Sequence, residues 1–328
     1  MRALVYTAPE HLEVRDMPDP QPGQGNVLVE VESVGICGSD MHAYLGHDER
    51  RPAPLILGHE VAGRAISGDG TARRVTVNPL VHCGACPACR SKRENLCPKR
   101  QIISMPPREG GFAERIVIPG NNLVPVPDHI SSDQAGLTEP IACGWHAARL
   151  AIAAQGQGAK ALVIGGGAIG LGAALSLRAQ GVSDILMSEP NETRRRYLSE
   201  RTSETVRAPD AMPAEPVFDI VVDGVGYAPT RAQASALVKP GGIIVHIGLG
   251  NAEGGLDIRR MTLQEITFVG TYTYTAQDFR DTAAAMFDGR LGPLDWVDPR
   301  ALAQGAQAFE DIRSGTVPAP KIILKPGL

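Results

Sequence analysis

The stretch that decides the fold of this chain is KALVIGGGAIGLGAALSLRAQG, residues 160–181. It consists of a short apolar run, a glycine-rich turn and a segment of small residues, and a second apolar run, DILMSE, follows at residues 184–189. This order predicts a strand, a turn, a helix and another strand. Further apolar runs lie at residues 218–226, 241–248 and 265–272, with a helical segment between the first two. Alternating strands and helices predict a doubly wound parallel sheet of the α/β class.

The glycine-rich turn has the spacing GxGxxG, formed by Gly165, Gly167 and Gly170. The first glycine permits a tight turn, the second lets a pyrophosphate approach the backbone, and the third allows a helix to pack closely on a strand. The helix that opens with Ala168 and Ile169 would present its free N–H groups to the phosphates. The turn therefore predicts a dinucleotide-binding (Rossmann) domain.

Two charged residues downstream of this turn bear on which dinucleotide binds. Glu189 ends the second strand, where a carboxylate can accept hydrogen bonds from the adenosine ribose hydroxyls. The same carboxylate would repel a 2′-phosphate, so the sequence favours NAD. Arg194 is the first of three consecutive arginines in the next helix and could reach a 2′-phosphate. NADP is therefore the alternative cofactor.

The residues before position 143 have a different pattern of apolar runs. Runs such as NVLVEVESVG at residues 26–35 are short and separated by Gly and Pro, which predicts the antiparallel strands of a β-rich domain. We assign the tail, with its final apolar run KIILK, to the same domain. The expected division is residues 1–142 together with 275–328 for the β-rich domain and residues 143–274 for the Rossmann domain, with the functional cleft between them.

The composition excludes several classes of protein. A formal net charge of −4 provides no basic field for nucleic acid. The sequence has no apolar run of the roughly 18 residues that a membrane span needs, and its N-terminus lacks the layout of a secretory signal. We therefore expect a cytoplasmic protein without nucleic-acid or membrane partners. In that reducing compartment, clustered cysteines favour metal or redox chemistry over disulfides.

Four of the six cysteines fall within HCGACPACRSKRENLC, residues 82–97. Cys83, Cys86, Cys89 and Cys97 can surround one tetrahedral ion. Four protein ligands leave no position for a substrate, so a zinc ion at this lobe would be structural. An iron–sulfur cluster is the alternative, because three cysteines at two-residue intervals also suit one. The wide spacing before the fourth cysteine favours zinc.

A second group of metal-binding residue types lies upstream, in GICGSDMH at residues 35–42 and GHE at residues 58–60. Cys37 and His59 offer a thiolate and an imidazole, which zinc accepts together. A catalytic zinc needs a third protein ligand and an open position, and spacing alone does not identify that ligand.

Together these motifs resemble the zinc-dependent medium-chain alcohol dehydrogenase family over essentially the whole chain. The resemblance rests on GICGSDMH, LILGHEVAG, the four-cysteine lobe, GGFAE, TEPIACGWHA and the glycine-rich turn, which occur in the family's order. The TEP segment is similar to the branch of polyol, butanediol and threonine dehydrogenases. The resemblance implies a GroES-like catalytic domain beside the Rossmann domain, and a homo-oligomer, either a dimer or a tetramer.

The resemblance also implies a second, catalytic zinc ion held by Cys37, His59 and Glu139. Glu60, next to His59, is an alternate or transient ligand, because either carboxylate is chemically acceptable. Asp40 would orient His59 through the second nitrogen of its ring.

Further residues receive roles by the same resemblance. Ser39 and His42 would carry the proton of the alcohol to solvent through the ribose hydroxyls. Cys143 would pack against the nicotinamide ring. The candidates for bonding substrate hydroxyls are Tyr44, Tyr272 and Tyr274.

The implied activity is the reversible oxidation of a secondary hydroxyl of a polyol or sugar alcohol to a ketone, with hydride transfer to NAD. Zinc would promote the loss of the hydroxyl proton. A dehydrogenase of a small secondary alcohol, a diol or a β-hydroxy amino acid is the first alternative. The second is a protein that binds NAD without catalysis.

Overall fold

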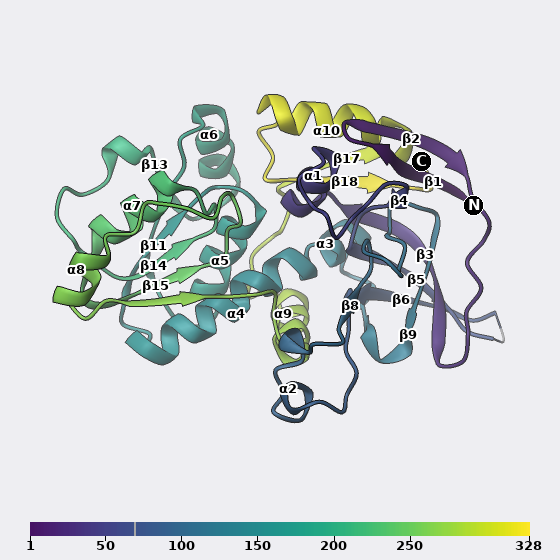
Figure 1. Ribbon diagram of the computed structural model, residues 1–328, viewed down its shortest axis with the longest axis horizontal. Helices are drawn as coiled ribbons and strands as arrows, with labels where there is room; N and C mark the ends of the chain where they lie inside the picture. The colour runs from purple at the N-terminus through teal and green to yellow at the C-terminus, as the bar shows by residue number, and fades with distance from the viewer. Residues whose placement is uncertain (69) are drawn as a thin grey trace.

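The glycine-rich stretch forms the strand, turn and helix that its pattern predicts. The computed structural model describes residues 1–68 and 70–328, and two sheet-based lobes lie side by side in it (Figure 1). In one lobe, β11 (Lys160–Ile164) leads through the turn into α5 (Ala168–Ala179), and β12 (Asp184–Ser188) follows.

Six parallel strands make up the sheet of this lobe, in the order β13-β12-β11-β14-β15-β16. Counted from β11, the order is 3-2-1-4-5-6, which is that of dinucleotide-binding sheets. The remaining strands are β13 (Thr205–Arg207), β14 (Phe218–Asp223), β15 (Val238–His246) and β16 (Thr267–Gly270). The predicted doubly wound α/β class is confirmed.

Both faces of this sheet are covered, which explains why its strands are continuous apolar runs. Val163 of β11 faces a core that includes residues of α4 (Thr138–Gln155) and α5. Leu162 and Ile164 alternate to the opposite face and pack in a second core with residues of α7 (Ala228–Leu237). The remaining helices of this lobe are α6 (Glu192–Arg201) and α8 (Ile258–Leu263).

The other lobe is rich in β-structure, as its pattern of apolar runs predicts. A seven-stranded sheet has the order β10-β6-β5-β3-β18-β17, with β9 paired to β3. These strands are β3 (Asn26–Gly35), β5 (Glu60–Ile66), β6 (Ala72–Val77), β9 (Arg115–Pro119), β10 (Leu123–Pro125), β17 (Val297–Ala301) and β18 (Lys321–Lys325). The two strands of the tail thus complete a sheet that the N-terminal half begins.

Two smaller sheets complete the β-rich lobe. One has the order β2-β1-β4, and the other pairs β7 with β8. Their strands are β1 (Arg2–Ala8), β2 (His11–Asp16), β4 (Leu55–Ile56), β7 (Leu80–Val81) and β8 (Gln101–Ile102).

The helices outside the dinucleotide-binding lobe are α1 (Gly38–Tyr44), α2 (Pro87–Arg90), α3 (Ser132–Gly136), α9 (Ala276–Phe287) and α10 (Gly305–Ser314). Short 3-10 turns occupy residues 94–96, 120–122, 209–211 and 302–304. Helix α9 is joined to α4 by Asp278, which accepts hydrogen bonds from His146 at 2.8 Å and Arg149 at 2.7 Å. Among the described residues, no helix combines the length and the apolar character that crossing a membrane requires.

Candidate active site

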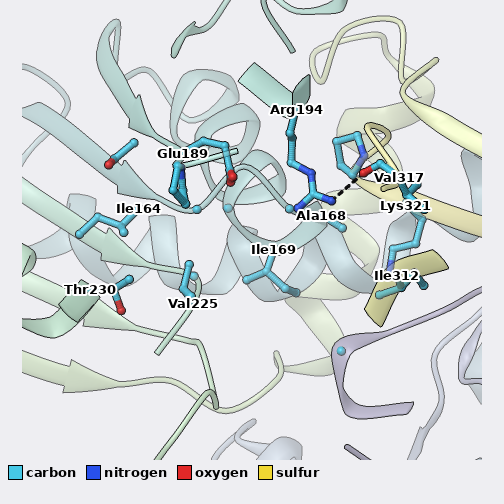
Figure 2. A pocket seen from close by; sticks show the side chains of 18 of the residues that line it. Ile164, Ala168, Ile169, Glu189, Arg194, Val225, Thr230, Ile312, Val317 and Lys321 are labelled. Atoms are coloured by element: carbon cyan, nitrogen blue, oxygen red, sulfur yellow. Dashed lines mark hydrogen bonds between the residues drawn. The ribbon is translucent and has the colours of Figure 1, made fainter. Parts of the chain in front are cut away.

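A cavity of about 670 Å³, called the cofactor cavity below, lies at the carboxyl ends of β11, β12 and β14 (Figure 2). Its lining includes five residues that the sequence assigns to the cofactor: Gly165, Gly167, Ala168, Ile169 and Gly170. Gly165 has a φ of 103°, and a Cβ on Gly170 would lie 1.8 Å from the Gly165 carbonyl oxygen. Both positions therefore require glycine, and the bare backbone leaves room for a pyrophosphate.

Glu189 also lines this cavity, but its carboxylate is already engaged by the backbone. Its two oxygens accept hydrogen bonds from the N–H groups of Gly166 at 2.7 Å and Asn191 at 2.8 Å. The side chain therefore braces the glycine-rich turn and also places a negative charge in the cavity wall.

Arg194 spans the cavity from the other side. Figure 2 shows its side chain reaching from α6 to Val317, where it donates a hydrogen bond of 3.0 Å to the carbonyl oxygen. Its Nε is buried and has no hydrogen-bond partner. This arginine thus ties the two lobes together across the cofactor cavity and keeps one donor free.

The four-cysteine lobe brings its sulfur atoms together as the sequence predicts. Within the described residues, Cys83, Cys86, Cys89 and Cys97 form a group whose ligand atoms all lie within 4.8 Å of one another. Three sulfur–sulfur distances are 3.5, 3.5 and 4.0 Å. Sulfur atoms about 2.3 Å from a tetrahedral zinc ion lie about 3.8 Å apart, so the set fits one structural zinc ion.

The thiols of this lobe differ in how readily they lose a proton. Hydrogen bonds from the backbone N–H groups of Ala85 and Cys86 lower the pKa of Cys83 to about 6. Burial raises the pKa of Cys89 to about 12. Because a metal ion binds the thiolate form, full deprotonation of the set needs the charge of a bound cation.

A second metal-binding group lies at the start of α1 and β5. Cys37 caps α1, and its sulfur accepts a hydrogen bond from the Ser39 N–H at 3.5 Å. His59 directly precedes β5, and Glu60 is the first residue of that strand. The ligand atoms of Cys37, His59 and Glu60 all lie within 4.8 Å of one another. A thiolate, an imidazole and a carboxylate form a donor set that zinc accepts.

Asp40 and Ser104 hold the imidazole of His59. Asp40, which is fully buried, lies 3.5 Å from Nδ1, and the hydroxyl of Ser104 lies 3.3 Å from the same atom. Engaging Nδ1 leaves Nε2 for a metal ion. Burial by itself lowers the pKa of His59, but the charges of Asp40 and Cys37 raise it well above its usual value. The surrounding negative charge therefore favours a cation at this site.

Only one of the two carboxylate oxygens of Glu60 has a hydrogen-bond partner. Its Oε1 accepts a hydrogen bond of 2.6 Å from Lys321, whose Nζ also donates to the Ile36 carbonyl at 2.8 Å. Its Oε2 is buried without a hydrogen-bond partner. A buried carboxylate oxygen without a partner is costly, and a metal ion beside Cys37 and His59 would satisfy it.

Glu139, the third ligand that the family resemblance implies, does not belong to this group of close ligand atoms. It is buried, and its Oε1 accepts a hydrogen bond of 2.8 Å from the Tyr274 hydroxyl. Burial is the largest cause of the raised pKa of Glu139, and the charge of Glu60 adds to it. The distances thus favour Glu60 over Glu139 for direct contact with a metal ion.

A second cavity, of about 300 Å³, adjoins this group and is called the substrate cavity below. It adjoins the cofactor cavity along a common wall, whose shared residues are Cys37, Gly38, Ile169, Gly224 and Val225. Other lining residues from the sequence predictions are Ser39, His42, His59, Glu139, Cys143, Tyr272 and Tyr274. The cleft brings together residues that lie far apart in the sequence.

One expectation about the substrate is wrong. Tyr44 does not line the cavity; it is buried, its hydroxyl donates to Glu310, and its ring packs against Phe309. Tyr274 lines the cavity, but its hydroxyl is bonded to Glu139.

Sequence reasoning missed four residues of this site. Lys321 pairs with Glu60 across a separation of 261 residues, which no local motif could reveal. Ser104, which contacts His59, carries no sequence signal. Arg50 and Arg51 line the substrate cavity, and adjacent arginines in a loop were the available signal.

The chain resembles known proteins over nearly its full length. Residues 23–128 match the family model of the alcohol dehydrogenase GroES-like domain, and residues 168–288 match that of the zinc-binding dehydrogenases. The L-galactonate-5-dehydrogenase of Escherichia coli K12 is 32% identical over 310 residues, which cover 89% of this chain and 88% of that protein.

Two further proteins show the same likeness. The (R,R)-butanediol dehydrogenase of Saccharomyces cerevisiae is 28% identical over 358 residues, which cover 95% of this chain and 92% of that protein. A solved structure of an oxidoreductase of unknown specificity from Escherichia coli matches with a TM-score of 0.90 at 26% identity, covering 99% of this chain and 98% of that chain. With the cleft and the two cysteine-containing sites in place, this chain belongs to the zinc-containing medium-chain alcohol dehydrogenase family and is a zinc-dependent oxidoreductase that uses NAD(P).

Proposed function

We propose that this enzyme reversibly oxidises a secondary hydroxyl of a polyol or sugar alcohol to a ketone and transfers the hydride to NAD. The observation that carries the proposal is the wall shared by the two cavities. Cys37, Gly38 and Ile169 line both, so a nicotinamide that enters from the cofactor cavity would meet a substrate held beside the metal-binding group.

The metal-binding group supplies the first requirement of the reaction. Zinc, when bound there, would lower the pKa of the substrate hydroxyl, because the carbon that bears a protonated hydroxyl does not release its hydride readily. Cys37 and His59 would hold the ion, with Glu60 as the third protein ligand. Glu139 would be an alternate ligand that does not contact the ion directly, and its hydrogen bond with the Tyr274 hydroxyl would orient it.

Ser39 and His42 would remove the proton. The Ser39 Oγ is buried without a hydrogen-bond partner and lines the substrate cavity, so it is free to accept a proton from the substrate and pass on its own. His42 lines the same cavity and is only partly buried. An imidazole with one side toward solvent can take up a proton at one ring nitrogen and release one from the other, which would deliver the proton outward.

The cofactor preference rests on Glu189. Its carboxylate is fixed by two backbone N–H groups, so it cannot swing away from an incoming 2′-phosphate. We therefore propose NAD as the preferred cofactor. Cys143, buried in the wall of the substrate cavity, would pack against the nicotinamide ring.

The relatives support a substrate with more than one hydroxyl. The name of the Escherichia coli relative specifies a sugar acid, and that of the yeast relative a diol. We also propose the division into residues 1–142 with 275–328 and residues 143–274, and assembly as a homo-oligomer.

The test is a substrate panel with zinc-loaded protein, NAD and NADP. We expect the highest kcat/KM for polyhydroxylated substrates with NAD. The increase in NADH absorbance measures the rate. Turnover confined to monohydric alcohols or β-hydroxy amino acids would contradict the polyol assignment. An absence of turnover with every alcohol, at full zinc content, would contradict catalysis itself.

A matched pair of histidine variants tests the proton path. His42→Ala should lower kcat about 10²-fold, which is the usual contribution of a positioned acid or base. His47→Ala, an exposed histidine five residues later, is the control and should keep the wild-type rate. Equal rates in both variants would remove His42 from the path.

A further inference from the structure

The wall of the substrate cavity carries more positive than negative charge. Arg50 and Arg51, in the loop between α1 and β4, both line the cavity. Glu139 is the only carboxylate among the described residues that line it. A neutral polyol needs hydrogen-bonding groups but no charge, so the two guanidinium groups call for another explanation.

One carboxylate serves both arginines. Asp48 accepts two hydrogen bonds from the guanidinium of Arg50, at 2.8 and 3.0 Å, and one from that of Arg51, at 2.7 Å. Glu49, which lies between Asp48 and Arg50 in the sequence, is exposed and does not line the cavity. Where this loop faces the cavity, two guanidinium groups against one carboxylate leave one positive charge.

The surplus charge lies at the mouth of the cavity. The side chains of Asp48 and Arg51 are 7% and 3% exposed, whereas that of Arg50 is 59% exposed. Arg50 is thus held by its bidentate pair with Asp48 while its outer surface stays free. Guanidinium groups fixed in this way bind carboxylate and phosphate oxygens with little loss of side-chain entropy.

Arg51 fixes the position of this loop relative to the reacting centre. Its Nε donates to the Ser104 carbonyl at 3.0 Å, and its Nη1 donates to the Ser39 carbonyl at 3.4 Å. Ser104 contacts His59, and Ser39 lies on the proposed proton path. Arg50 is therefore anchored at a set position from the site where the hydroxyl reacts.

A second guanidinium lies near the same wall. Arg100 stacks 4.7 Å from the centre of the Tyr272 ring, and its Nε donates to the Tyr272 hydroxyl at 3.3 Å. Tyr272 lines the cavity, so Arg100 adds positive potential behind it.

Thr273, next to Tyr272, indicates that this wall also binds hydroxyl groups. Its Oγ1 is buried without a hydrogen-bond partner, and the residue lines the cavity. Its φ is 47°, a left-handed conformation that a β-branched residue rarely adopts. Such strained residues and unpaired polar groups cluster at ligand sites, where the ligand supplies the missing bond.

From these observations we propose that the substrate is an anionic polyol, with a carboxylate or phosphate at the end remote from the reacting hydroxyl, and that Arg50 binds this anionic group. The inference rests on the proposed function and narrows its substrate class. The cavity of about 300 Å³ lies at the lower end of the range for ligand pockets, which suits a short polyhydroxylated chain.

The test compares three substrates of equal carbon number with zinc-loaded protein and NAD: an alditol, the corresponding aldonate and the alditol phosphate. The wild type should show a kcat/KM at least about tenfold higher for one of the charged substrates than for the alditol. The identity of the preferred charged substrate distinguishes carboxylate from phosphate.

The variant Arg50→Gln should lower this charged-to-neutral ratio about 10- to 100-fold, mainly through a higher KM for the charged substrate. Arg64→Gln is the matched control, because Arg64 is 50% exposed and pairs with Glu32 at 2.6 Å, and neither residue lines the cavity. Arg50 is exposed enough that its replacement should not disturb folding, which a melting curve checks.

The outcomes separate this inference from the function on which it rests. A wild type that prefers the alditol, or an Arg50→Gln variant that keeps the wild-type ratio, overturns the anionic substrate while leaving polyol oxidation intact. No turnover of any of the three substrates overturns the proposed function. The ratio should also fall as salt is raised, because ions screen the guanidinium at the mouth.

Discussion

The two cysteine-containing sites of this enzyme differ in how many ligands the chain offers to a metal ion. At the four-cysteine lobe, four sulfur atoms from one short segment face one another. At the start of α1 and β5, a sulfur, an imidazole and a carboxylate come from two segments, and Lys321 from a distant strand holds one carboxylate oxygen. The first set could surround an ion completely, whereas the second would leave one position of an ion open.

This difference assigns the roles of the sites. Four thiolates fill a tetrahedral ion, so the lobe can stabilise the fold but cannot bind a substrate. Three protein ligands leave one position open, and the substrate cavity lies against that group. We therefore propose that the densest cluster of thiols in the chain is the structural site and that the sparse set is the reactive one.

The largest effect is expected when the sparse set loses a ligand. Cys37→Ala should lower kcat/KM at least about 10³-fold, because metal-ion catalysis contributes several kcal/mol to the reaction and about 1.4 kcal/mol corresponds to a factor of ten. The melting temperature should change little. Steady-state kinetics and zinc analysis check this, and a variant that keeps both its rate and its zinc would contradict the assignment.

Breaking the buried pair behind the sparse set should chiefly affect stability. Lys321→Met leaves Glu60 as a buried carboxylate without its partner, which typically costs about 3–5 kcal/mol. Glu60→Gln combined with Lys321→Met should recover part of the loss, because the uncompensated charge is then gone. Denaturant unfolding of Lys321→Met, of Glu60→Gln and of the double variant measures the coupling. Strictly additive losses would show that the two side chains act independently.

At the four-cysteine lobe the expected effect is a moderate loss of stability with chemistry retained. Cys89→Ser should lower the melting temperature by at least about 5 °C, because removing a metal ligand costs a few kcal/mol. The kcat of the folded fraction should stay near that of the wild type. A variant that remains fully stable but loses turnover would reverse the roles of the two sites.

The smallest effect is expected at a thiol that lies beside the reactive site without joining its ligand set. Burial is the largest cause of the raised pKa of Cys143, so this thiol remains protonated and is a poor metal ligand. Cys143→Ala should change kcat less than about threefold and leave the zinc content unaltered. A loss comparable to that of Cys37→Ala would place Cys143 among the reactive groups.

Much of the fold could be predicted because its signals are local. The glycine spacing at residues 165–170 reflects contacts within one turn, where a side chain on Gly170 would clash with the Gly165 carbonyl. The apolar runs of β11, β14 and β15 reflect burial on both faces of a parallel sheet. The four cysteines form a set because sixteen residues can wrap around one ion.

The reactive site could be predicted only in part. Cys37 and His59 came from motifs, but the choice between Glu60 and Glu139 depends on which carboxylate the fold brings near them. The tyrosines show the same limit, because Tyr44 turns into the core and Tyr274 turns to Glu139.

The sequence by itself therefore determined the parallel sheet, the dinucleotide turn and the four-cysteine set, since each shows in a pattern of residues that are close along the chain. The order of such local motifs along the chain indicated the family. Only the tertiary structure decided the pairing of Lys321 with Glu60, the position of Arg50 at the cavity mouth and the unpaired hydroxyl of Thr273. These features join segments that meet only when β18 enters the sheet beside β3 and the two lobes close on one cleft. Contacts between distant segments leave no periodicity or spacing in the sequence, and they are the contacts that shape the substrate cavity.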